Sequence, residues 1–450
     1  MDYREALTWL DWVQGRGIKL GLENVSRLLD AMDRPQNAFP SVAVAGTNGK
    51  GSVSACLSSI LTRAGIRTGL YTSPHLVRYE ERIAIGGVPV DASAFASAVS
   101  MVRGRIDTLL ASGGLASHPT HFEILTAAAL AHFRTARVEA AVLEVGMGGR
   151  LDAVSAAPAR VSVITTIGLE HTQFLGATVE AIAAEKAGII RAGQTVISGV
   201  EDPAAARVIE EKAAALGARL VQLRRAARIE TASGAPDSFT LVTSRDRYEG
   251  LQLPLAGRHQ RDNAAMAVLA AEALDELGAL PAPVTREAIV SGVASASWPG
   301  RLQIVGREPL FLLDGAHNPA GCAALARSVD DLRARGEFDR LCLVFGALKE
   351  KDVPSMAREI FPRADRVILT RGRSERFREP QDVARETEGT GPEPPSVMIV
   401  EELGAAIEEA RRWCGGEDAV LLCGSLYLVG DALALMGVDP FPHTLQKPLQ

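Results

Sequence analysis

The chain has 450 residues, of which 47% are hydrophobic and 23% are charged, values that are ordinary for a globular protein. This length is sufficient for two or more domains, each with a core of its own. The formal charge of −6, from 48 basic and 54 acidic side chains, argues against a surface that coats nucleic acid, but it leaves room for a local cationic pocket that binds an anionic substrate.

Strands and helices alternate over the first half of the sequence. Hydrophobic periodicity predicts helices at 2–13, 22–32, 52–64, 91–110, 121–136, 178–187 and 202–216. Strands are expected just before Gly46 and at 67–72, 140–144, 161–167, 195–200 and 219–223. This alternation predicts an α/β fold: a mostly parallel sheet of the kind that carries a phosphate-binding loop, with helices on both faces.

The alternation is interrupted once and then starts again. Residues 226–256 contain short alternating segments between Gly, Pro, Asp and Ser turns, which predicts an antiparallel appendage. Helices at 260–277 and 284–294 follow, and Ser-Trp-Pro-Gly at 297–300 marks the expected boundary between a domain of residues 1–297 and one of residues 298–450. A smaller Rossmann-like α/β domain is predicted by strands at 310–314, 340–346, 366–370, 396–400 and 419–423. No G-x-G-x-x-G sequence marks a dinucleotide site there.

The cysteines and the start of the sequence bear on the compartment. The five cysteines are odd in number and show no C-x-x-C spacing, which favours reduced and mostly buried thiols. The sequence begins Met-Asp-Tyr-Arg-Glu, without the apolar core of a signal peptide, and has no run of 18 apolar residues. We therefore expect a cytoplasmic protein, a monomer, that binds small molecules rather than a membrane or nucleic acid.

The most informative segment is the turn after the first strand, Gly46-Thr47-Asn48-Gly49-Lys50-Gly51-Ser52. Glycines let backbone N–H groups approach an anion, the following helix N-terminus adds about half a positive charge, and Lys50 supplies a charge for the outer phosphates of a nucleotide. The strict G-x-x-x-x-G-K-[ST] pattern is not met, since Gly51 stands where a hydroxyl residue usually holds Mg²⁺. The metal is therefore expected to take its ligands elsewhere. An ordinary glycine-rich turn is the alternative.

Three further strand ends carry polar groups. Ser73, Glu144 and His171 lie at or just after predicted strands, and ligands of parallel sheets gather at the carboxyl ends of the strands. The carboxylate of Glu144 is a suitable ligand for Mg²⁺. Taken singly, Glu144 is equally explained as a solvated strand end, and His171 as a hydrogen-bonded loop histidine. Together with the glycine-rich turn, the three residues predict a site for a metal and a nucleotide.

The remaining candidates have simpler alternatives. Asp314 and His317 lie in Asp-Gly-Ala-His-Asn-Pro, just after a predicted strand, where a helix cap made by Asp or Asn is the competing explanation. Arg301 follows the boundary turn and could move with the second domain onto a transferring phosphate. Lys186, in Ala-Ala-Glu-Lys-Ala-Gly, is more simply explained by the sequence alone as a solvated helix residue.

Five motifs, in this order, carry a resemblance to a known family. They are Gly46–Ser52, Thr72-Ser-Pro-His-Leu76, Glu144-Val-Gly-Met-Gly-Gly-Arg-Leu-Asp152, Trp298-Pro-Gly-Arg301 and Asp314-Gly-Ala-His-Asn-Pro319. From about Leu20 to Gly430 the chain resembles the bacterial bifunctional dihydrofolate synthase/folylpolyglutamate synthases of the Mur ligase superfamily. The resemblance implies an N-terminal domain that binds ATP and folate, and a C-terminal Rossmann-like domain.

The resemblance also implies roles for individual residues. The phosphates of ATP would be bound by Gly46, Thr47, Asn48, Gly49, Lys50, Gly51 and Ser52, and the rest of the nucleotide by Asn263, Arg301 and Asp314. Mg²⁺ would be held by Ser73, Glu144 and His171. The pterin portion of the substrate would contact Thr120, Phe122, Arg150, Asp152 and Ala153. The transfer chemistry would fall to Lys50, Lys186, Arg301 and His317, with Lys186 carried as a carbamate.

The implied activity is that of an ATP-dependent acid–amino-acid ligase that adds L-glutamate to dihydropteroate and to folates through an acyl phosphate. Both activities are expected because Lys19–Val25 is similar to the same stretch of the bifunctional members. Within the class, the alternatives are a folylpolyglutamate synthase only and a Mur-type ligase of cell-wall synthesis, although Gly51-Ser52 argues against the latter. The alternative of another class is a nucleotide-dependent binding switch, but no Asn-Lys-x-Asp segment is present to read guanine.

Overall fold

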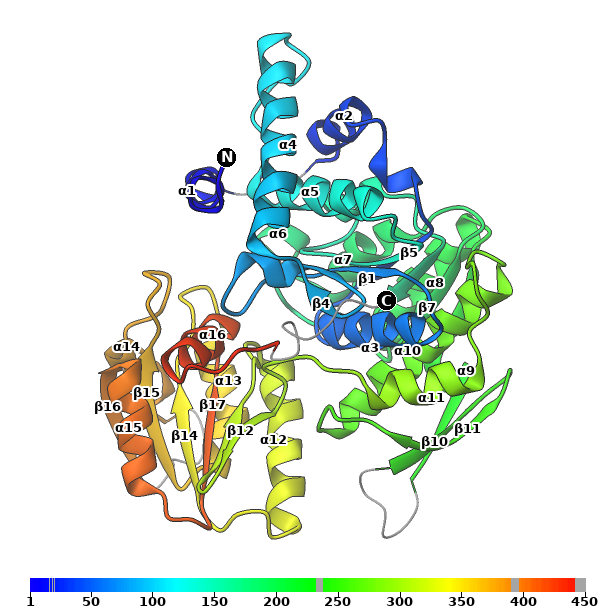
Figure 1. Cartoon of the computed structure of the whole chain (residues 1–450). Helices are drawn as coiled ribbons and strands as arrows, with labels where there is room; N and C mark the ends of the chain where they lie inside the picture. Colours follow the sequence, from blue (N-terminus) through cyan, green and yellow to red (C-terminus); the bar gives the residue numbers. More distant parts are fainter. Residues whose placement is uncertain (16, 18, 20, 232–237, 390–395, 442–450) are drawn as a thin grey trace. The chain divides into compact units, whose positions relative to one another are not determined.

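The computed structural model describes residues 1–15, 17, 19, 21–231, 238–389 and 396–441, so Leu20, at the start of the resemblance, lies outside the described residues. The chain forms two compact units. The first unit consists of residues 1–74, 79–254 and 261–297, and the second of residues 75–78 and 255–260 and the chain from Trp298 on. The first unit runs from blue to green and the second from yellow-green to red in Figure 1.

The first unit is built on an eight-stranded sheet in the order β4-β3-β2-β5-β1-β6-β7-β8. Its strands are β1 (Ser41–Ala45), β2 (Thr68–Tyr71), β3 (Ile83–Ile85), β4 (Val88–Pro89), β5 (Ala140–Glu144), β6 (Val161–Ile164), β7 (Thr195–Ser198) and β8 (Arg219–Gln222). The strands from β2 to β8 in this order are parallel, whereas β3 and β4 add an antiparallel edge that the sequence did not predict. The mostly parallel sheet confirms the predicted fold class.

Both faces of this sheet are covered. Ala43 and Ala45 of β1 belong to the core that also contains Phe95 and Leu130, while Val42 and Val44, which alternate with the two alanines, are equally buried on the other face. The larger helices of the unit are α1 (Tyr3–Gln14), α2 (Glu23–Ala31), α3 (Lys50–Arg63), α4 (Ala92–Ala111), α5 (His121–Thr135), α7 (Val179–Lys186), α8 (Pro203–Ala215), α10 (Arg258–Glu276, of which residues 258–260 are counted with the second unit) and α11 (Arg286–Ala294). Two short helices, α6 (Thr172–Leu175) and α9 (Leu223–Ala226), complete it. Side chains of Asp2, Asp91, Thr120, Thr178, Asp202 and Thr285 cap six of these helices.

The predicted antiparallel appendage is confirmed. It is a three-stranded sheet in the order β11-β10-β9, with bounds β9 (Ala227–Glu230), β10 (Ser238–Thr243) and β11 (Arg247–Gln252). Its buried side chains, Phe239, Leu241, Tyr248 and Leu251, recur along strands whose other described residues are partly or fully exposed. This sheet is therefore buried on one face, and Figure 1 shows it beside α10 and α11.

The second unit contains a six-stranded sheet in the order β12-β13-β17-β14-β15-β16. Its strands are β12 (Gln303–Arg307), β13 (Leu310–Leu313), β14 (Leu341–Phe345), β15 (Arg366–Arg371), β16 (Val397–Glu402) and β17 (Ala419–Cys423). All are parallel to their neighbours except β12, an antiparallel edge strand that the sequence did not predict. Its helices are α12 (Pro319–Ala334), α13 (Val353–Ile360), α14 (Pro380–Thr387), α15 (Leu403–Trp413) and α16 (Leu426–Leu435).

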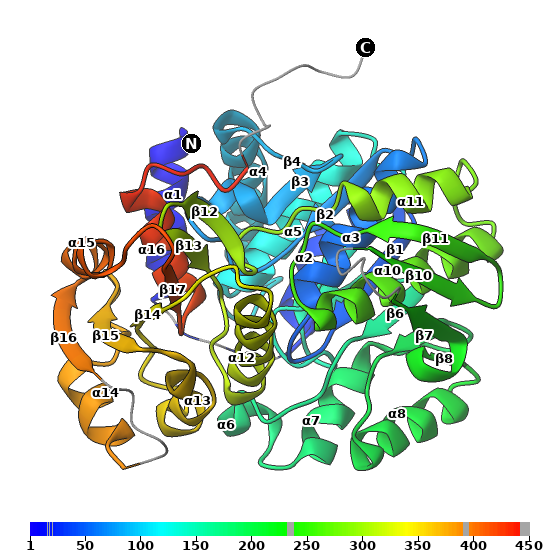
Figure 2. The ribbon, with the colours of Figure 1, turned by 90° about the horizontal axis from the view of Figure 1, so that it is seen from below.

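This second sheet also has two covered faces. Leu310 and Leu312 of β13 belong to the core that includes α12 and α13, while Phe311 and Leu313 belong to a separate core with α15 and α16. Figure 2 shows α15 and α16 on one side of the sheet and α12, α13 and α14 on the other. The predicted Rossmann-like alternation is therefore confirmed.

Two expectations about the environment can be compared with the structure. All five cysteines are free, and four of them are buried, as the spacing predicted. Within the part of the chain that the structure describes, no helix combines the length and the apolar character needed to cross a bilayer.

Candidate functional site

The turn between β1 and α3 forms a narrow backbone cradle. Gly46 has φ 150° and Gly49 has φ 90°, both in the region that favours glycine. A Cβ at Gly49 would lie 2.5 Å from Asn263 Oδ1, and a Cβ at Gly46 would overlap the Thr165 hydroxyl. Glycine at these positions therefore lets the chain pass close to its neighbours, with the N–H groups of α3 placed to meet an anion.

Residues after β6 hold the cradle in place. The Thr47 N–H donates to Thr166 O at 2.7 Å, and the Asn48 N–H donates to Thr166 Oγ1 at 3.1 Å. The Thr165 hydroxyl donates to Asn48 O at 2.6 Å. The Thr47 hydroxyl donates to Gly168 O at 3.2 Å and accepts from the Gly168 N–H at 3.1 Å. These supporting residues were missed because strand 161–167 was expected to continue through them, and Thr165, Thr166 and Ile167 are all residue types that favour strands.

Two lysine side chains converge on one carbonyl of the cradle. Lys50 Nζ donates to Gly46 O at 3.0 Å and to Thr47 O at 3.1 Å, and Lys186 Nζ donates to Gly46 O at 2.7 Å. Lys186 is only 4% exposed, so its explanation as a solvated helix residue is wrong. Burial, followed by the positive charge of Lys50, lowers the pKa of Lys186 to about 7. A substantial fraction of this lysine is therefore a neutral amine near physiological pH.

The three predicted metal ligands follow strands of one sheet: Ser73 and Glu144 belong to the ends of the adjacent strands β2 and β5, whereas His171 lies beyond β6, which β1 separates from β5. Glu144 is the last residue of β5, and its carboxylate is buried, so its explanation as a solvated strand end is wrong. Its Oε2 accepts the backbone N–H of Ser73, after β2, at 3.2 Å. His171, beyond β6, has φ 51° and places Nε2 3.8 Å from Glu170 Oε1.

The donor set has the chemistry that Mg²⁺ requires. A buried carboxylate with a hydroxyl residue beside it supplies the oxygen ligands that this ion prefers, and histidine is the unusual member. Among the described residues, no group of three or more His, Cys, Asp and Glu side chains could hold a metal by itself. A metal at Glu144 would therefore also depend on the Ser73 hydroxyl, on water or on substrate oxygens.

Two of the predicted pterin-binding residues lie at the start of α5. Thr120 caps this helix, since its hydroxyl accepts the Glu123 N–H at 3.3 Å and its own N–H donates to Glu123 Oε2 at 2.7 Å. The ring of Phe122 lies against Gly146, where a Cβ would approach the ring to 2.7 Å. The glycine-rich segment after β5 therefore passes directly over an aromatic ring.

The other predicted pterin-binding residues lie at the end of the same segment. Asp152 accepts three backbone N–H groups, from Gly146 (3.1 Å) and Met147 (3.0 Å) at Oδ2 and from Val154 (3.0 Å) at Oδ1. Burial nevertheless raises its pKa to about 6. Ala153 is buried in the next turn. Arg150, unlike Asp152 and Ala153, has an exposed side chain, and its guanidinium pairs with Glu185 of α7 at 2.8 Å.

In the second unit, Arg301 and Asp314 are held around one turn. Asp314 follows β13, and its carboxylate accepts the N–H groups of Leu302 and Ala316, both at 2.8 Å. Arg301 Nη1 donates to Gly300 O at 3.0 Å and lies so close to Gly315 that a Cβ there would overlap it. The carboxylate thus fixes the backbone beside the guanidinium.

The helix cap that the sequence offered as an alternative is made by Asn318 and not by Asp314. Asn318 caps α12 by accepting the Gly321 N–H at 2.8 Å, so Asp314 is not the cap of this helix. His317 places Nδ1 2.8 Å from Gly315 O. The structure therefore brings Arg301, Asp314 and His317 to one end of β13, within a single unit.

Comparisons with known proteins cover nearly the whole chain. The model of the Mur ligase middle domain matches residues 44–271, and that of the Mur ligase glutamate ligase domain matches residues 300–426. A dihydrofolate synthase/folylpolyglutamate synthase of Bacillus subtilis is 34% identical over 435 residues, which cover 95% of this chain and 98% of that protein.

Two solved structures show the same similarity. Escherichia coli FolC in complex with DHPP and ADP is 30% identical with a TM-score of 0.84, and the match covers 96% of this chain and 97% of that one. The bifunctional folylpolyglutamate synthase/dihydrofolate synthase of Yersinia pestis, complexed with AMPPNP and a Mn ion, is 30% identical with a TM-score of 0.84, and here the coverage is 97% and 98%.

Proposed function

Since the chain belongs to the dihydrofolate synthase/folylpolyglutamate synthase family of the Mur ligase superfamily, we propose that its site adds L-glutamate both to dihydropteroate and to folates at the expense of ATP. The observation that carries the proposal is the convergence of Lys50 and Lys186 on the Gly46 carbonyl, in a glycine cradle at the N-terminus of α3. This arrangement is suited to polyanionic phosphate.

The reaction needs an activated acid, because oxide is a poor leaving group when a carboxylate meets an amine. The terminal phosphoryl group of ATP passes to the carboxylate and gives an acyl phosphate. The amine of L-glutamate then attacks the carbonyl carbon, and phosphate leaves. The N–H groups of the Gly46–Ser52 turn bind the phosphates, while Lys50 and Arg301 neutralise the charge that develops on the transferring group. Asn263, Asp314 and His317 complete the nucleotide site.

The metal site and Lys186 belong to the same proposal. Ser73, Glu144 and His171 would hold Mg²⁺, which supplies further neutralisation of phosphate charge when it is bound. Lys186, with its lowered pKa, has the neutral amine that carbon dioxide requires to form a carbamate. The carbamate would replace a cation beside Lys50 by an anion that supports the metal.

The acid substrate would lie against the segment after β5. Phe122 offers a ring for stacking on the pterin. The carboxylate of Asp152 has about four acceptor positions. Backbone N–H groups fill three of these positions, so one position is left for an N–H group of the substrate. Thr120, Arg150 and Ala153 complete this proposed contact surface. The monomeric state and the cytoplasmic location stay predictions, which light scattering and cell fractionation would check.

The decisive experiment is a panel of acids. Purified protein with ATP, Mg²⁺ and L-glutamate should release ADP when dihydropteroate or tetrahydrofolate is added, and a UDP-muramyl acid should give no release. Turnover with tetrahydrofolate only would restrict the activity to chain extension. ADP release that depends on a protein partner and on none of the acids would support a binding switch and contradict the proposal.

A further inference from the structure

A cavity of about 580 Å³ lies in the first unit, between the edge strand β8 and helix α10. This volume is within the range of pockets that hold small molecules. Asn263, near the start of α10, approaches Gly49 of the nucleotide cradle, whereas the cavity is lined by Leu269 and later residues of that helix. At about 1.5 Å per residue, the cavity lies about 9 Å or more further along α10, so it is distinct from the cradle.

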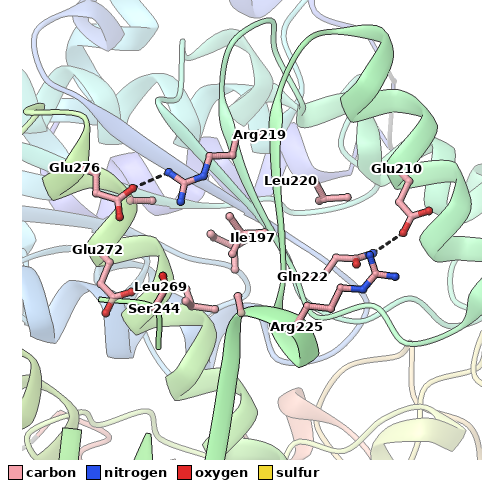
Figure 3. A pocket seen from close by; sticks show the side chains of 13 residues that line it. Ile197, Glu210, Arg219, Leu220, Gln222, Arg225, Ser244, Leu269, Glu272 and Glu276 are labelled. Atoms are coloured by element: carbon pink, nitrogen blue, oxygen red, sulfur yellow. Dashed lines mark hydrogen bonds and ion pairs between the residues drawn. The ribbon is translucent and has the colours of Figure 1, made fainter. Parts of the chain in front are cut away.

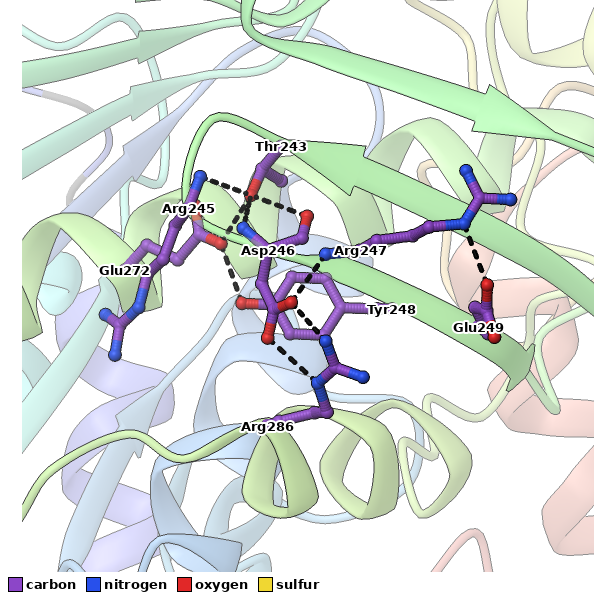
Figure 4. A network of polar contacts seen from close by, with 8 residues as sticks. All are labelled: Thr243, Arg245, Asp246, Arg247, Tyr248, Glu249, Glu272 and Arg286. Atoms are coloured by element: carbon purple, nitrogen blue, oxygen red, sulfur yellow. Dashed lines mark hydrogen bonds and ion pairs between the residues drawn. The ribbon is translucent and has the colours of Figure 1, made fainter.

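A buried carboxylate lines this cavity. Glu272 is only 4% exposed, and its Oε1 accepts the hydroxyls of Tyr248 and Thr243, both at 2.8 Å (Figure 4). Among the residues that the structure describes, no donor is bound to its second oxygen, Oε2. Burial raises the pKa of Glu272, which reflects the incomplete solvation of the carboxylate. The cavity therefore contains an acceptor that a ligand N–H or O–H could satisfy.

The cavity also contains an arginine that is available for an anion. Figure 3 shows two pairs among the other polar side chains of the wall: Arg219 with Glu276 at 2.7 Å, and Gln222 with Glu210 at 2.6 Å. Arg225, on α9, makes no hydrogen bond, ion pair or ring contact with any other described residue. Its guanidinium is the natural partner of a carboxylate or another acid group.

We propose that this cavity binds a small amphoteric molecule, with a hydrogen-bond donor directed to Glu272, an acid group directed to Arg225, and an apolar body against Ile197, Leu220 and Leu269. All five of these side chains line the cavity. A ligand with an acid group but no hydrogen-bond donor would leave the second oxygen of Glu272 without a partner, and the glutamates of the wall would repel it. An amine without an acid would leave Arg225 without a counter-charge. The inference is independent of the ligase reaction.

The test uses 4-(aminomethyl)benzoate as the probe, with benzoate and benzylamine as analogues that lack one end each. Calorimetric titration of the full-length protein should detect millimolar or tighter binding of the probe, unchanged by saturating ADP and Mg²⁺. Each analogue should bind at least ~5-fold more weakly. Arg225→Ala and Glu272→Gln should weaken probe binding by a similar factor, and Arg225→Ala should leave ADP release in the ligase assay unchanged.

The matched control is Arg228→Ala, which removes an arginine of β9 that lies outside the cavity and pairs with Glu230 at 2.6 Å. Its probe affinity should equal that of the wild type. Three results would each overturn the proposal: no binding of the probe at millimolar concentration, equal affinity in Arg225→Ala and wild type, or displacement of the probe by ADP.

Discussion

Lys186 shows how burial changes the chemistry of a single side chain. Its pKa is lowered to about 7 in the folded protein, whereas an unfolded lysine has a pKa of about 10.4. Between these values the unfolded chain binds more protons, so the folded state gains stability as the pH rises. Below pH 7 both states are protonated, and the cost of burying the charged lysine is fully present.

We therefore expect the stability of the wild type, relative to Lys186→Met, to increase between pH ~7 and pH ~9 by about 2 kcal/mol. Urea unfolding in carbon-dioxide-free buffer measures both free energies of unfolding. Lys212→Met removes an exposed lysine of α8 and is the matched control. Its stability should run parallel to that of the wild type over this range. If the free energies of unfolding of Lys186→Met and of the wild type also change in parallel with pH, the pKa of Lys186 is not lowered in the folded protein.

Gly49 offers a test of the cradle itself. Gly49 and Gly65 both have positive φ, 90° and 79°, but only Gly49 would place a Cβ against Asn263, while Gly65 has open space. Substitution by Ala costs about 1 kcal/mol of backbone strain at either site. We expect Gly49→Ala to raise the KM for ATP by about tenfold or more, and Gly65→Ala to leave it unchanged. Steady-state kinetics measures the KM for ATP of both variants. Equal KM values for Gly49→Ala and Gly65→Ala would show that the close approach of Gly49 to Asn263 has no role in ATP binding.

The sequence predicted residue identities better than residue environments. The glycines and Lys50 of the turn were recognised because their types and order are local properties. Lys186 was identified only through the family resemblance, because its burial depends on Gly46, which is 140 positions away in the chain. The three backbone N–H groups on Asp152 could not be read from the sequence for the same reason, since their geometry depends on how the loop folds back.

At the scale of elements, long periodic segments were predicted and short ones were not. The unpredicted strands β3, β4 and β12 have three, two and five residues. A two- or three-residue strand is too short for alternation to appear, and β12 is only partly buried, so it lacks an apolar run. Helix α3 begins at Lys50 rather than at residue 52, because Gly49 already has the conformation that ends the turn.

The appended sheet is joined to α10 by a buried hydrogen bond that can be removed alone. Tyr248→Phe deletes the hydroxyl that donates to Glu272 at 2.8 Å and preserves the ring. We expect a loss of about 1–3 kcal/mol in the free energy of unfolding, because a buried carboxylate loses one of its two donors. The loss should be greater at pH ~8 than at pH ~5, since the hydroxyl favours ionised Glu272, whose pKa burial raises.

Denaturant unfolding at the two pH values measures this loss. Arg247→Ala, which removes exposed ion pairs with Glu230 and Glu249 on the same sheet, is the control and should cost no more than about 1 kcal/mol. A Tyr248→Phe loss no larger than that of the control would show that the hydrogen bond does not hold the sheet to α10.

At the scale of the whole molecule, net charge and local charge differ in sign. The chain carries −6 overall, yet two lysines meet at the nucleotide turn of the first unit, and Arg301 lies at the end of β13 in the second. Four of the five motifs of the resemblance lie at strand ends, three in the large sheet of the first unit and one, Asp314–Pro319, after β13 of the second, whereas Trp298–Arg301 precedes β12. The proposal that the two units serve one reaction needs a functional test.

A double-mutant cycle between the units provides that test. If Lys50 and Arg301 neutralise the same developing charge, Lys50→Met and Arg301→Lys should each lower kcat by about 10²-fold or more. Their double mutant should lose less than the product of the two factors, because residues that act on one transition state are not additive. Arg258→Lys is the control, since it changes an exposed arginine paired with Asp331 at 2.7 Å. The kcat of this control should be near that of the wild type. If the loss of kcat in the double mutant equals the product of the two single losses, Lys50 and Arg301 act independently and do not neutralise the same charge.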